Sequence, residues 1–244
     1  MRAGFQIHFG NAIGGVFIES LPRGIDAKAL TKIDPFIVPA QKMHLTGLSF
    51  LHQIHAATGK DVVPKASPVN FVDTGDYLIT AMQGIGLGIL TADCLPVLCV
   101  DITHNVVGIA HVGWRGAAAG VHLEMIREMS MLYGTKFHEV RLIFGPSALS
   151  CCYQVNESFI TEMHGVNPYA QECATTITPS GSIQFDLPTF VKETAMVSGV
   201  KSALINRLHN RCTICNDEFF SYRRQGAQAG RQMSIISLSS SSMR

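Results

Sequence analysis

Three neighbouring apolar segments, 86–91, 96–101 and 106–111, most strongly restrict how this chain can fold. Each is short, rich in Val, Ile and Leu, and apolar at successive rather than only at alternate positions. Such segments are typical of strands that are buried on both faces. We therefore predict a sheet that is covered on two sides.

Further strand-like segments extend the predicted sheet. They lie at 4–9, 48–54, 77–80, 141–144, 182–185 and 233–238. Residues 101–105 form a short polar link between two of the central segments, as in a β-hairpin, so at least part of the sheet should be antiparallel.

Apolar residues recur with helical spacing at 117–133, 157–164 and 187–198. Gly134 and Gly199 follow the first and the last of these segments, and glycine is common just after a helix end. Helices interspersed among paired strands indicate the α+β class, with a mixed sheet between layers of helices.

The chain has the size and composition of one domain. Of its 244 residues 47% are hydrophobic and 15% charged, with a mean hydropathy of +0.22, which is enough apolar material for one sizeable core. The sequence has no repeat of fixed period and no long linker. We predict a single domain over residues 1–238, followed by a serine-rich tail at 239–244 that frays.

Charge and hydropathy limit the expected partners. The net charge is +1 without basic blocks, so the long-range field of a nucleic-acid-binding protein is missing. The longest apolar stretch, 84–100, contains Asp93 and Pro96 and is shorter than the about 20 residues that cross a bilayer. The amino terminus lacks the apolar segment of a signal peptide. We expect a cytoplasmic protein, monomeric or weakly homo-oligomeric, that binds neither nucleic acid nor membranes.

The cysteines are typical of reduced thiols. Their number, seven, is odd, and Cys151 and Cys152 are adjacent, which does not favour a disulfide framework. Cys212 and Cys215 form a Cys-x-x-Cys motif, but a structural zinc site needs a second pair of ligands, and the sequence has no second such motif. We interpret these residues as ordinary buried or surface thiols.

Cys94 and His111 have the clearest catalytic potential. Cys94 follows the apolar segment 86–91, so its thiol should lie where a strand breaks and turns. His111 ends the return strand of the hairpin, and strand pairing should bring its imidazole near Cys94. His52 and His55 offer a third ligand, but on a strand they point to opposite faces, so only one of them can face a given site.

Two imidazoles and a thiolate allow three chemistries. Zinc with three protein ligands keeps a fourth position open for water or substrate, and lowers the pKa of bound water to about 7. The same ligands with an axial methionine describe a blue-copper site. Multicopper oxidation, however, needs His-x-His pairs, and none of the ten histidines has that spacing, so zinc is favoured over copper. Without a metal, Cys94 would be a nucleophile and His111 its base.

Arg115 and Gly116 lead into the helix predicted at 117–133. The free N–H groups of a helix amino terminus, with an arginine beside them, form a natural site for phosphate or a substrate carboxylate. Alternatively, Arg115 pairs with Asp93 and orients a loop. Arg223, in a Ser-Tyr-Arg-Arg sequence, belongs to a second polar cluster near the carboxyl end.

Five motifs, in order along the chain, resemble those of the YfiH or laccase-domain family. They are Gln53-Ile54-His55, Thr91-Ala92-Asp93-Cys94-Leu95-Pro96-Val97, His111-Val112-Gly113-Trp114-Arg115-Gly116, Gly145-Pro146 with Cys152-Tyr153-Gln154-Val155, and Cys212-Thr213 with Phe219-Phe220-Ser221-Tyr222-Arg223-Arg224. They extend over most of the chain. Ala56 and Val112 are mild departures, whereas the amino-terminal third retains only Gly14-Gly15 of its usual pattern.

The resemblance implies a zinc ion held by His55, Cys94 and His111, which selects His55 over His52. It implies a three-layer α/β/α arrangement around a mixed sheet, similar to the cysteine-hydrolase domain of the cytotoxic necrotizing factor toxins. Members are named purine nucleoside phosphorylases with adenosine deaminase activity, and formerly bore the name multicopper polyphenol oxidases.

The resulting hypothesis is a zinc-dependent phosphorylase that uses a purine nucleoside and phosphate, with phosphate near Arg115 and Gly116 and with Arg223 as a further substrate contact. Adenosine deamination, with Asp93 as the acid or base, and cleavage of methylthioadenosine would be further reactions. The alternatives are a metal-free Cys/His hydrolase, a copper-dependent polyphenol oxidase and a non-enzymatic binding module.

Overall fold

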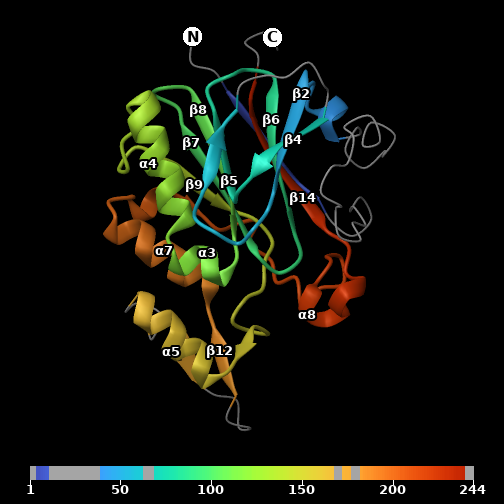
Figure 1. Ribbon diagram of the computed structural model, residues 1–244, viewed down its shortest axis with the longest axis vertical. Coiled ribbons are helices and arrows are strands. Elements are labelled where there is room, and N and C mark those ends of the chain that lie inside the picture. Colours follow the sequence, from blue (N-terminus) through green and yellow to red (C-terminus); the bar gives the residue numbers. More distant parts are fainter. Residues whose placement is uncertain (1–3, 11–38, 63–68, 168–171, 177–181, 240–244) are drawn as a thin grey trace.

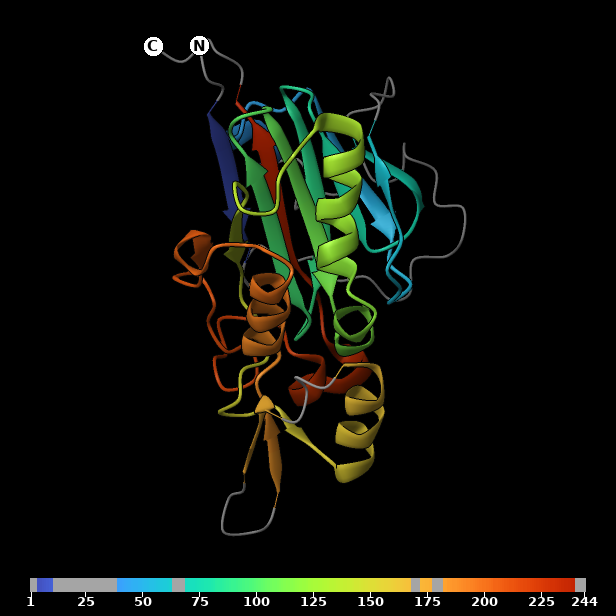
Figure 2. The same cartoon turned by 90° about the vertical axis from the view of Figure 1, so that its left-hand side faces the viewer.

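The structure, a computed structural model, describes residues 4–10, 39–62, 69–167, 172–176 and 182–239. In these residues the chain forms two large β-sheets that face each other, with helices α4 and α7 on the outer side of one sheet (Figures 1 and 2). A small three-stranded sheet lies beside α5, away from the two large sheets (Figure 1).

The six-stranded sheet has the order β13-β9-β7-β8-β5-β3. Its strands are β3 (Gly59–Asp61), β5 (Tyr77–Thr80), β7 (Leu95–Asp101), β8 (Val106–Val112), β9 (Arg141–Phe144) and β13 (Ile205–Asn206). β7 and β8 pair antiparallel over their whole length, which confirms the predicted hairpin. The pairs β3–β5 and β13–β9 are parallel, so the sheet is mixed.

The five-stranded sheet has the order β1-β14-β6-β2-β4. Its strands are β1 (Phe5–Phe9), β2 (Gly47–His52), β4 (Val69–Thr74), β6 (Ile85–Thr91) and β14 (Gln232–Leu238). It is also mixed, because β14 runs antiparallel to β1 and β6 whereas β2 runs parallel to β4 and β6. The first and last described strands of the chain therefore lie side by side.

The remaining elements flank these sheets. The small antiparallel sheet consists of β10 (Gln154–Val155), β11 (Ala174–Thr176) and β12 (Ile183–Phe185). The helices include α3 (Trp114–Ala118), α4 (Val121–Tyr133), α5 (Glu157–Val166), α7 (Leu187–Val197) and α8 (Tyr222–Gln225), with short 3-10 turns at Ser202–Leu204 and Gly226–Gln228.

Successive residues of the central strands enter different cores. In β7, Val97 and Cys99 belong to the cluster that packs against the helices, whereas Leu98 and Val100 belong to the cluster between the two sheets. A third apolar cluster covers the outer face of the five-stranded sheet. The α+β class with mixed sheets is thus confirmed. The strands form two facing sheets rather than one, because an apolar strand face can pack equally well on a helix or on a second sheet.

The helix predicted at 117–133 is two helices. α3 ends at Ala118 and α4 begins after Gly120, whose φ of 76° is left-handed and interrupts the helical backbone. Gly134, also at φ 76°, ends α4 as predicted. The break allows α3 to turn away from α4 toward the ends of the strands (Figure 1).

Two features noted in the sequence fall outside the described residues. They are the part of the predicted 239–244 tail that follows Ser239, and Gly14-Gly15. Across the ranges described above, no helix is both long enough and apolar enough to span a lipid bilayer.

Candidate functional site

Three candidate ligands converge where the two large sheets meet. His55 follows β2, His111 lies in β8, and Cys94 lies in the short connection from β6 to β7, where the chain crosses from one sheet to the other. One ring nitrogen of each histidine and the Cys94 Sγ all lie within 4.8 Å of one another. The two imidazoles meet edge to face, with their centroids 4.8 Å apart. His52 lies outside this cluster and packs on Phe71.

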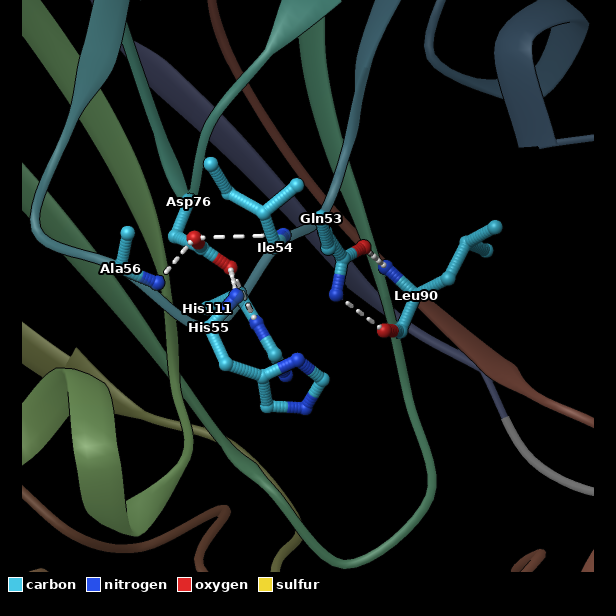
Figure 3. Close-up of polar contacts among 7 residues, drawn as sticks. All are labelled: Gln53, Ile54, His55, Ala56, Asp76, Leu90 and His111. Carbon is cyan, nitrogen blue, oxygen red and sulfur yellow. Dashed lines mark hydrogen bonds and ion pairs between the residues drawn. The ribbon is translucent and has the colours of Figure 1, made fainter. Parts of the chain in front are cut away.

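A buried carboxylate, Asp76, holds the His111 imidazole and the backbone of the segment that carries His55 (Figure 3). It accepts a hydrogen bond from Nδ1 of His111 at 2.8 Å. It also accepts from the backbone N–H groups of Ile54, His55 and Ala56, at 3.3, 3.0 and 2.6 Å. Burial alone would raise the pKa of Asp76, but the His111 imidazole and these amides hold it below its usual value. Asp76 therefore stays ionised and fixes the chain on both sides of the cluster.

The segment that carries His55 is held by unusual backbone and side-chain contacts. His55 has a φ of 60°, a left-handed conformation that costs about 1–3 kcal/mol and needs support from its surroundings. Asp76 supplies part of that support. The Gln53 side chain also fixes this segment, because its amide donates to the Leu90 carbonyl at 2.8 Å and accepts from the Leu90 N–H at 2.9 Å (Figure 3).

Sequence reasoning missed the roles of both Asp76 and Gln53. Gln53 belonged to a recognised motif, but nothing in the sequence pointed to Leu90, which is 37 positions away. Asp76 follows Gly75, at φ 150°, at the start of an apolar strand. An acidic residue directly after glycine at a strand start was the signal that was available.

Cys94 and His111 shift each other's ionisation. Burial raises the pKa of the Cys94 thiol, but the imidazoles of His111 and His55 outweigh it and lower that pKa to about 6. Burial lowers the pKa of His111, whereas Cys94 and Asp76 raise it to about 9. The two values belong to one coupled pair, in which a thiolate and an imidazolium stabilise each other. The thiolate, which is the nucleophilic and metal-binding form, is favoured at neutral pH.

The three donors fit a tetrahedral metal ion. Because His111 Nδ1 donates to Asp76, its Nε2 can bind an ion when it releases its proton, and a carboxylate behind a ligating imidazole is the usual outer contact of a metal site. Two imidazoles and one thiolate leave one coordination position for a reactant. His55, Cys94 and His111 could therefore hold an ion that a substrate reaches.

A cavity of about 890 Å³ lies over this cluster. Its lining includes the aromatic side chains of Trp114, Tyr153 and Tyr222 and the guanidinium groups of Arg223 and Arg231. Aromatic faces and guanidinium groups together suit a ligand that has both an aromatic ring and an anionic group.

Asp93 also lines this cavity, and both of its carboxylate oxygens hold neighbouring loops. It accepts from the hydroxyls of Thr213 and Ser221, at 2.7 and 3.0 Å, and from the backbone N–H of Arg223 at 2.6 Å. Its backbone has a φ of 83°. These contacts join the β6–β7 connection to the segment that precedes β14, so they position Arg223 beside the cavity.

The predicted anion-site residues, Arg115 and Gly116, lie next to Trp114, which lines the cavity. Arg115 lies on the short helix α3, with its guanidinium 4.1 Å from the centre of the Trp114 ring, and neither Arg115 nor Gly116 is among the residues that line the cavity. Gly116 is buried instead, facing Val121. Among the described residues, the Asp93 carboxylate forms no ion pair with Arg115.

Arg223 lines the cavity and is held in place from two sides. Its Nη1 donates to the Gln154 carbonyl at 2.8 Å, and its guanidinium lies 5.4 Å from the centre of the Tyr153 ring. Arg231 donates to the carbonyls of Ala229 and Gly230. Each guanidinium retains further N–H donors for a ligand.

Comparison with known proteins links this chain to a family. The family described as multi-copper polyphenol oxidoreductase laccase matches residues 35–239. A purine nucleoside phosphorylase of Clostridium acetobutylicum is 30% identical over 193 residues, which cover 78% of this chain and 76% of that protein. A protein named adenosine deaminase, from an unknown prokaryotic organism, is 29% identical over 162 residues, or 66% of this chain and 61% of that protein. The crystal structure of the Bacillus licheniformis hypothetical protein YfiH superposes with a TM-score of 0.81 at 27% identity, covering 96% of this chain and 92% of that one.

Proposed function

The chain belongs to the multi-copper polyphenol oxidoreductase laccase family, and on that premise we propose that it is a zinc-dependent purine nucleoside phosphorylase. It is an enzyme, as the relatives named phosphorylase and deaminase indicate. The observation that carries the proposal is one cavity that contains His55, Cys94 and His111 together with Arg223 and Arg231.

Phosphorolysis defines what the cavity has to do. The bond between ribose C1′ and the purine nitrogen breaks, and a phosphate oxygen forms a new bond to C1′. The purine leaves with the bonding electron pair and takes up a proton, so the products are the free base and ribose 1-phosphate. Positive charge develops on the ribose during this exchange, and a fixed phosphate beside C1′ stabilises it.

Arg223 and Arg231 are the groups that we assign to phosphate, in place of Arg115. Both line the cavity, and both are already oriented by backbone carbonyls. A guanidinium oriented before the ligand arrives loses little conformational freedom when it binds a phosphate with two parallel hydrogen bonds. Tyr153 and Trp114 offer aromatic faces for the purine.

The remaining residues organise the reacting region. Zinc held by His55, Cys94 and His111 would supply a Lewis acid beside the substrate. Asp76 keeps Nδ1 of His111 protonated and its ring in one orientation. Asp93 holds the backbone of Arg223, so we propose a positioning role for it rather than the acid or base role suggested by its sequence context.

The test is phosphate-dependent cleavage of inosine. The zinc-loaded protein should form hypoxanthine and ribose 1-phosphate in equal amounts, and only when phosphate is present. His55→Ala should abolish the reaction, whereas His138→Ala, at an exposed position away from the cavity, should leave it unchanged. Unchanged nucleosides with metal bound would refute the proposal.

We extend the proposal to adenosine and methylthioadenosine. Deamination replaces the exocyclic amine of adenosine with the oxygen of water and releases ammonia, and the relative named adenosine deaminase supports this reaction. Chromatography separates the two outcomes, because deamination yields inosine without phosphate while phosphorolysis yields adenine. Methylthioadenosine should yield adenine in the presence of phosphate.

A second candidate function rests on the hydrogen-bonded series Cys94, His111 and Asp76. A nucleophilic thiolate, an imidazole and an orienting carboxylate are the parts of a metal-free cysteine hydrolase. Iodoacetamide would inactivate such an enzyme, while a chelator would leave it active. Loss of activity with the chelator and recovery with zinc would favour the phosphorylase.

The donors favour zinc over the copper of the family description. Multicopper oxidation needs several clustered imidazoles. In the described parts of the chain, the groups suited to a metal ion are the His55 cluster and a set of four cysteines.

A further inference from the structure

A second cluster of thiols lies outside the proposed active site. Cys151 and Cys152 follow β9, and Cys212 and Cys215 follow β13. Their four sulfur atoms all lie within 4.8 Å of one another. From the sequence, the Cys-x-x-Cys motif lacked a second ligand pair. In the folded chain, the adjacent Cys151 and Cys152 provide that pair.

Backbone hydrogen bonds bring the two cysteine pairs together. Ser147 and Cys212 form an isolated parallel bridge, in which the Ser147 N–H donates to the Arg211 carbonyl and the Thr213 N–H donates to the Ser147 carbonyl, each at 3.0 Å. A tight turn then brings Cys152 back, because its N–H donates to the Leu149 carbonyl at 3.0 Å. The ligand positions are therefore set by loops that are hydrogen-bonded independently of the sulfur atoms.

The sulfur spacing fits a tetrahedral ion. Zinc–sulfur bonds of about 2.3 Å place the four sulfur atoms of a tetrahedral site roughly 3.8 Å apart. The Sγ atoms of Cys151 and Cys215 are 3.9 Å apart. A disulfide would need about 2.05 Å, so the observed distance fits a shared ion better than a covalent bond.

The surroundings of Cys212 also favour a metal-bound thiolate. The backbone N–H groups of Cys215, Leu149 and Ile214 donate hydrogen bonds to its sulfur. Amide donors directed at a ligating sulfur are the kind of outer contact that stabilises metal centres.

We propose that Cys151, Cys152, Cys212 and Cys215 bind a structural zinc ion. Four protein ligands close the coordination sphere, so this site has no position for a reactant. Its role would be mechanical, because the two loops that it joins carry cavity-lining residues. Tyr153 follows the first cysteine pair, and Ile214 lies within the second motif. The proposal does not depend on which reaction the cavity performs.

The decisive variant removes the other centre. In His55→Ala/Cys94→Ala, the active-site cluster keeps a single ligand, so any tightly bound zinc must lie elsewhere. Elemental analysis should find one zinc per chain in this variant, and X-ray absorption should show sulfur neighbours alone at about 2.3 Å. Loss of all zinc, or nitrogen in its coordination shell, would overturn the proposal.

A second measurement uses the unaltered protein and does not depend on a variant folding. Cys151 and Cys215 are exposed, so as free thiols they would react quickly with iodoacetamide. Bound to zinc, they should be protected until a chelator is added, as mass spectrometry of the alkylated peptides would show. Immediate alkylation, or a disulfide in the purified protein, would contradict the proposal.

A pair of substitutions completes the test. Cys212→Ser/Cys215→Ser should lower the zinc content by one ion per chain relative to the unaltered protein. Cys173→Ala changes a buried cysteine that belongs to neither cluster and should leave the zinc content unchanged. Equal zinc content in all three proteins would overturn the proposal.

Discussion

The two candidate metal-binding clusters both include cysteine thiols but are built in opposite ways. The His55, Cys94 and His111 cluster lies between two sheets, around the buried carboxylate of Asp76, and faces a cavity. The four-cysteine cluster lies on two loops, with all of its ligand positions filled by the chain. Donor chemistry alone therefore does not separate a reactive centre from a structural one. The distinction depends on whether a reactant can reach the ligands and on which groups lie behind them.

The largest expected difference between the clusters is in catalysis. Cys94→Ser should lower kcat/KM for inosine about a thousandfold, equal to about 4 kcal/mol of transition-state free energy, because it removes a ligand beside the substrate. Its melting temperature should change little. Cys212→Ser should show the reverse pattern, with substantial activity and a lower melting temperature. Steady-state kinetics and thermal unfolding of both variants measure these effects. If the two patterns were exchanged, the assignment of one cluster to catalysis and the other to stability would be contradicted.

Asp76→Asn tests whether the group behind the ligands defines the reactive centre. Loss of the carboxylate leaves the His111 ring without its charged partner, so zinc affinity at this centre should fall about 10- to 100-fold. Competition with a chromophoric chelator measures this affinity. Asp73→Asn, at an exposed ion pair with Lys60, is the matched control. Unchanged zinc affinity in Asp76→Asn would show that the carboxylate is not needed to hold the centre.

Cys212→Ser/Cys215→Ser tests the mechanical role of the other cluster. At a free zinc concentration about 1,000 times the dissociation constant, zinc should add about 4 kcal/mol to the free energy of unfolding, and the variant should lose that contribution. Denaturant unfolding with and without zinc measures it. Cys173→Ala should retain the zinc-dependent gain. A gain in the double variant as large as in the unaltered protein would contradict the structural role.

The smallest expected effect concerns the anion contacts in the cavity over the His55, Cys94 and His111 cluster. Arg223→Lys should raise KM for phosphate about tenfold, equal to about 1.4 kcal/mol, because lysine cannot reproduce the two parallel hydrogen bonds of a guanidinium. Zinc content should stay the same. Arg127→Lys, on the exposed face of α4, is the control. A phosphate KM that does not respond to Arg223→Lys would move the anion site elsewhere.

Local features of the fold could be predicted from the sequence. The hairpin of β7 and β8 followed from two apolar segments and the polar link at 101–105, because pairing and turn are both encoded nearby. The left-handed break at Gly120 was missed, since a glycine inside an apolar helical pattern is compatible with an unbroken helix. The division of the strands between two sheets was also hidden, because it depends on which apolar face meets which partner.

The site was predictable only in part, for the same physical reason. Cys94 and His111 lie at strand ends that pair locally, so their proximity follows from the register of β7 and β8. Asp76, 35 positions from His111, is brought there by the pairing of β5 with β8. The four cysteines are brought together by the isolated β-bridge between Ser147 and Cys212, which no local sequence pattern predicts.

Anomalous diffraction at the zinc edge tests the central claim most directly, because it locates each ion among its ligands. The account predicts two peaks per chain. One should lie between His55, Cys94 and His111 with three protein ligands, and the other between the four cysteines with none of its positions open. A chain with no peak between His55, Cys94 and His111, or with the imidazoles turned away from Cys94, would contradict the account.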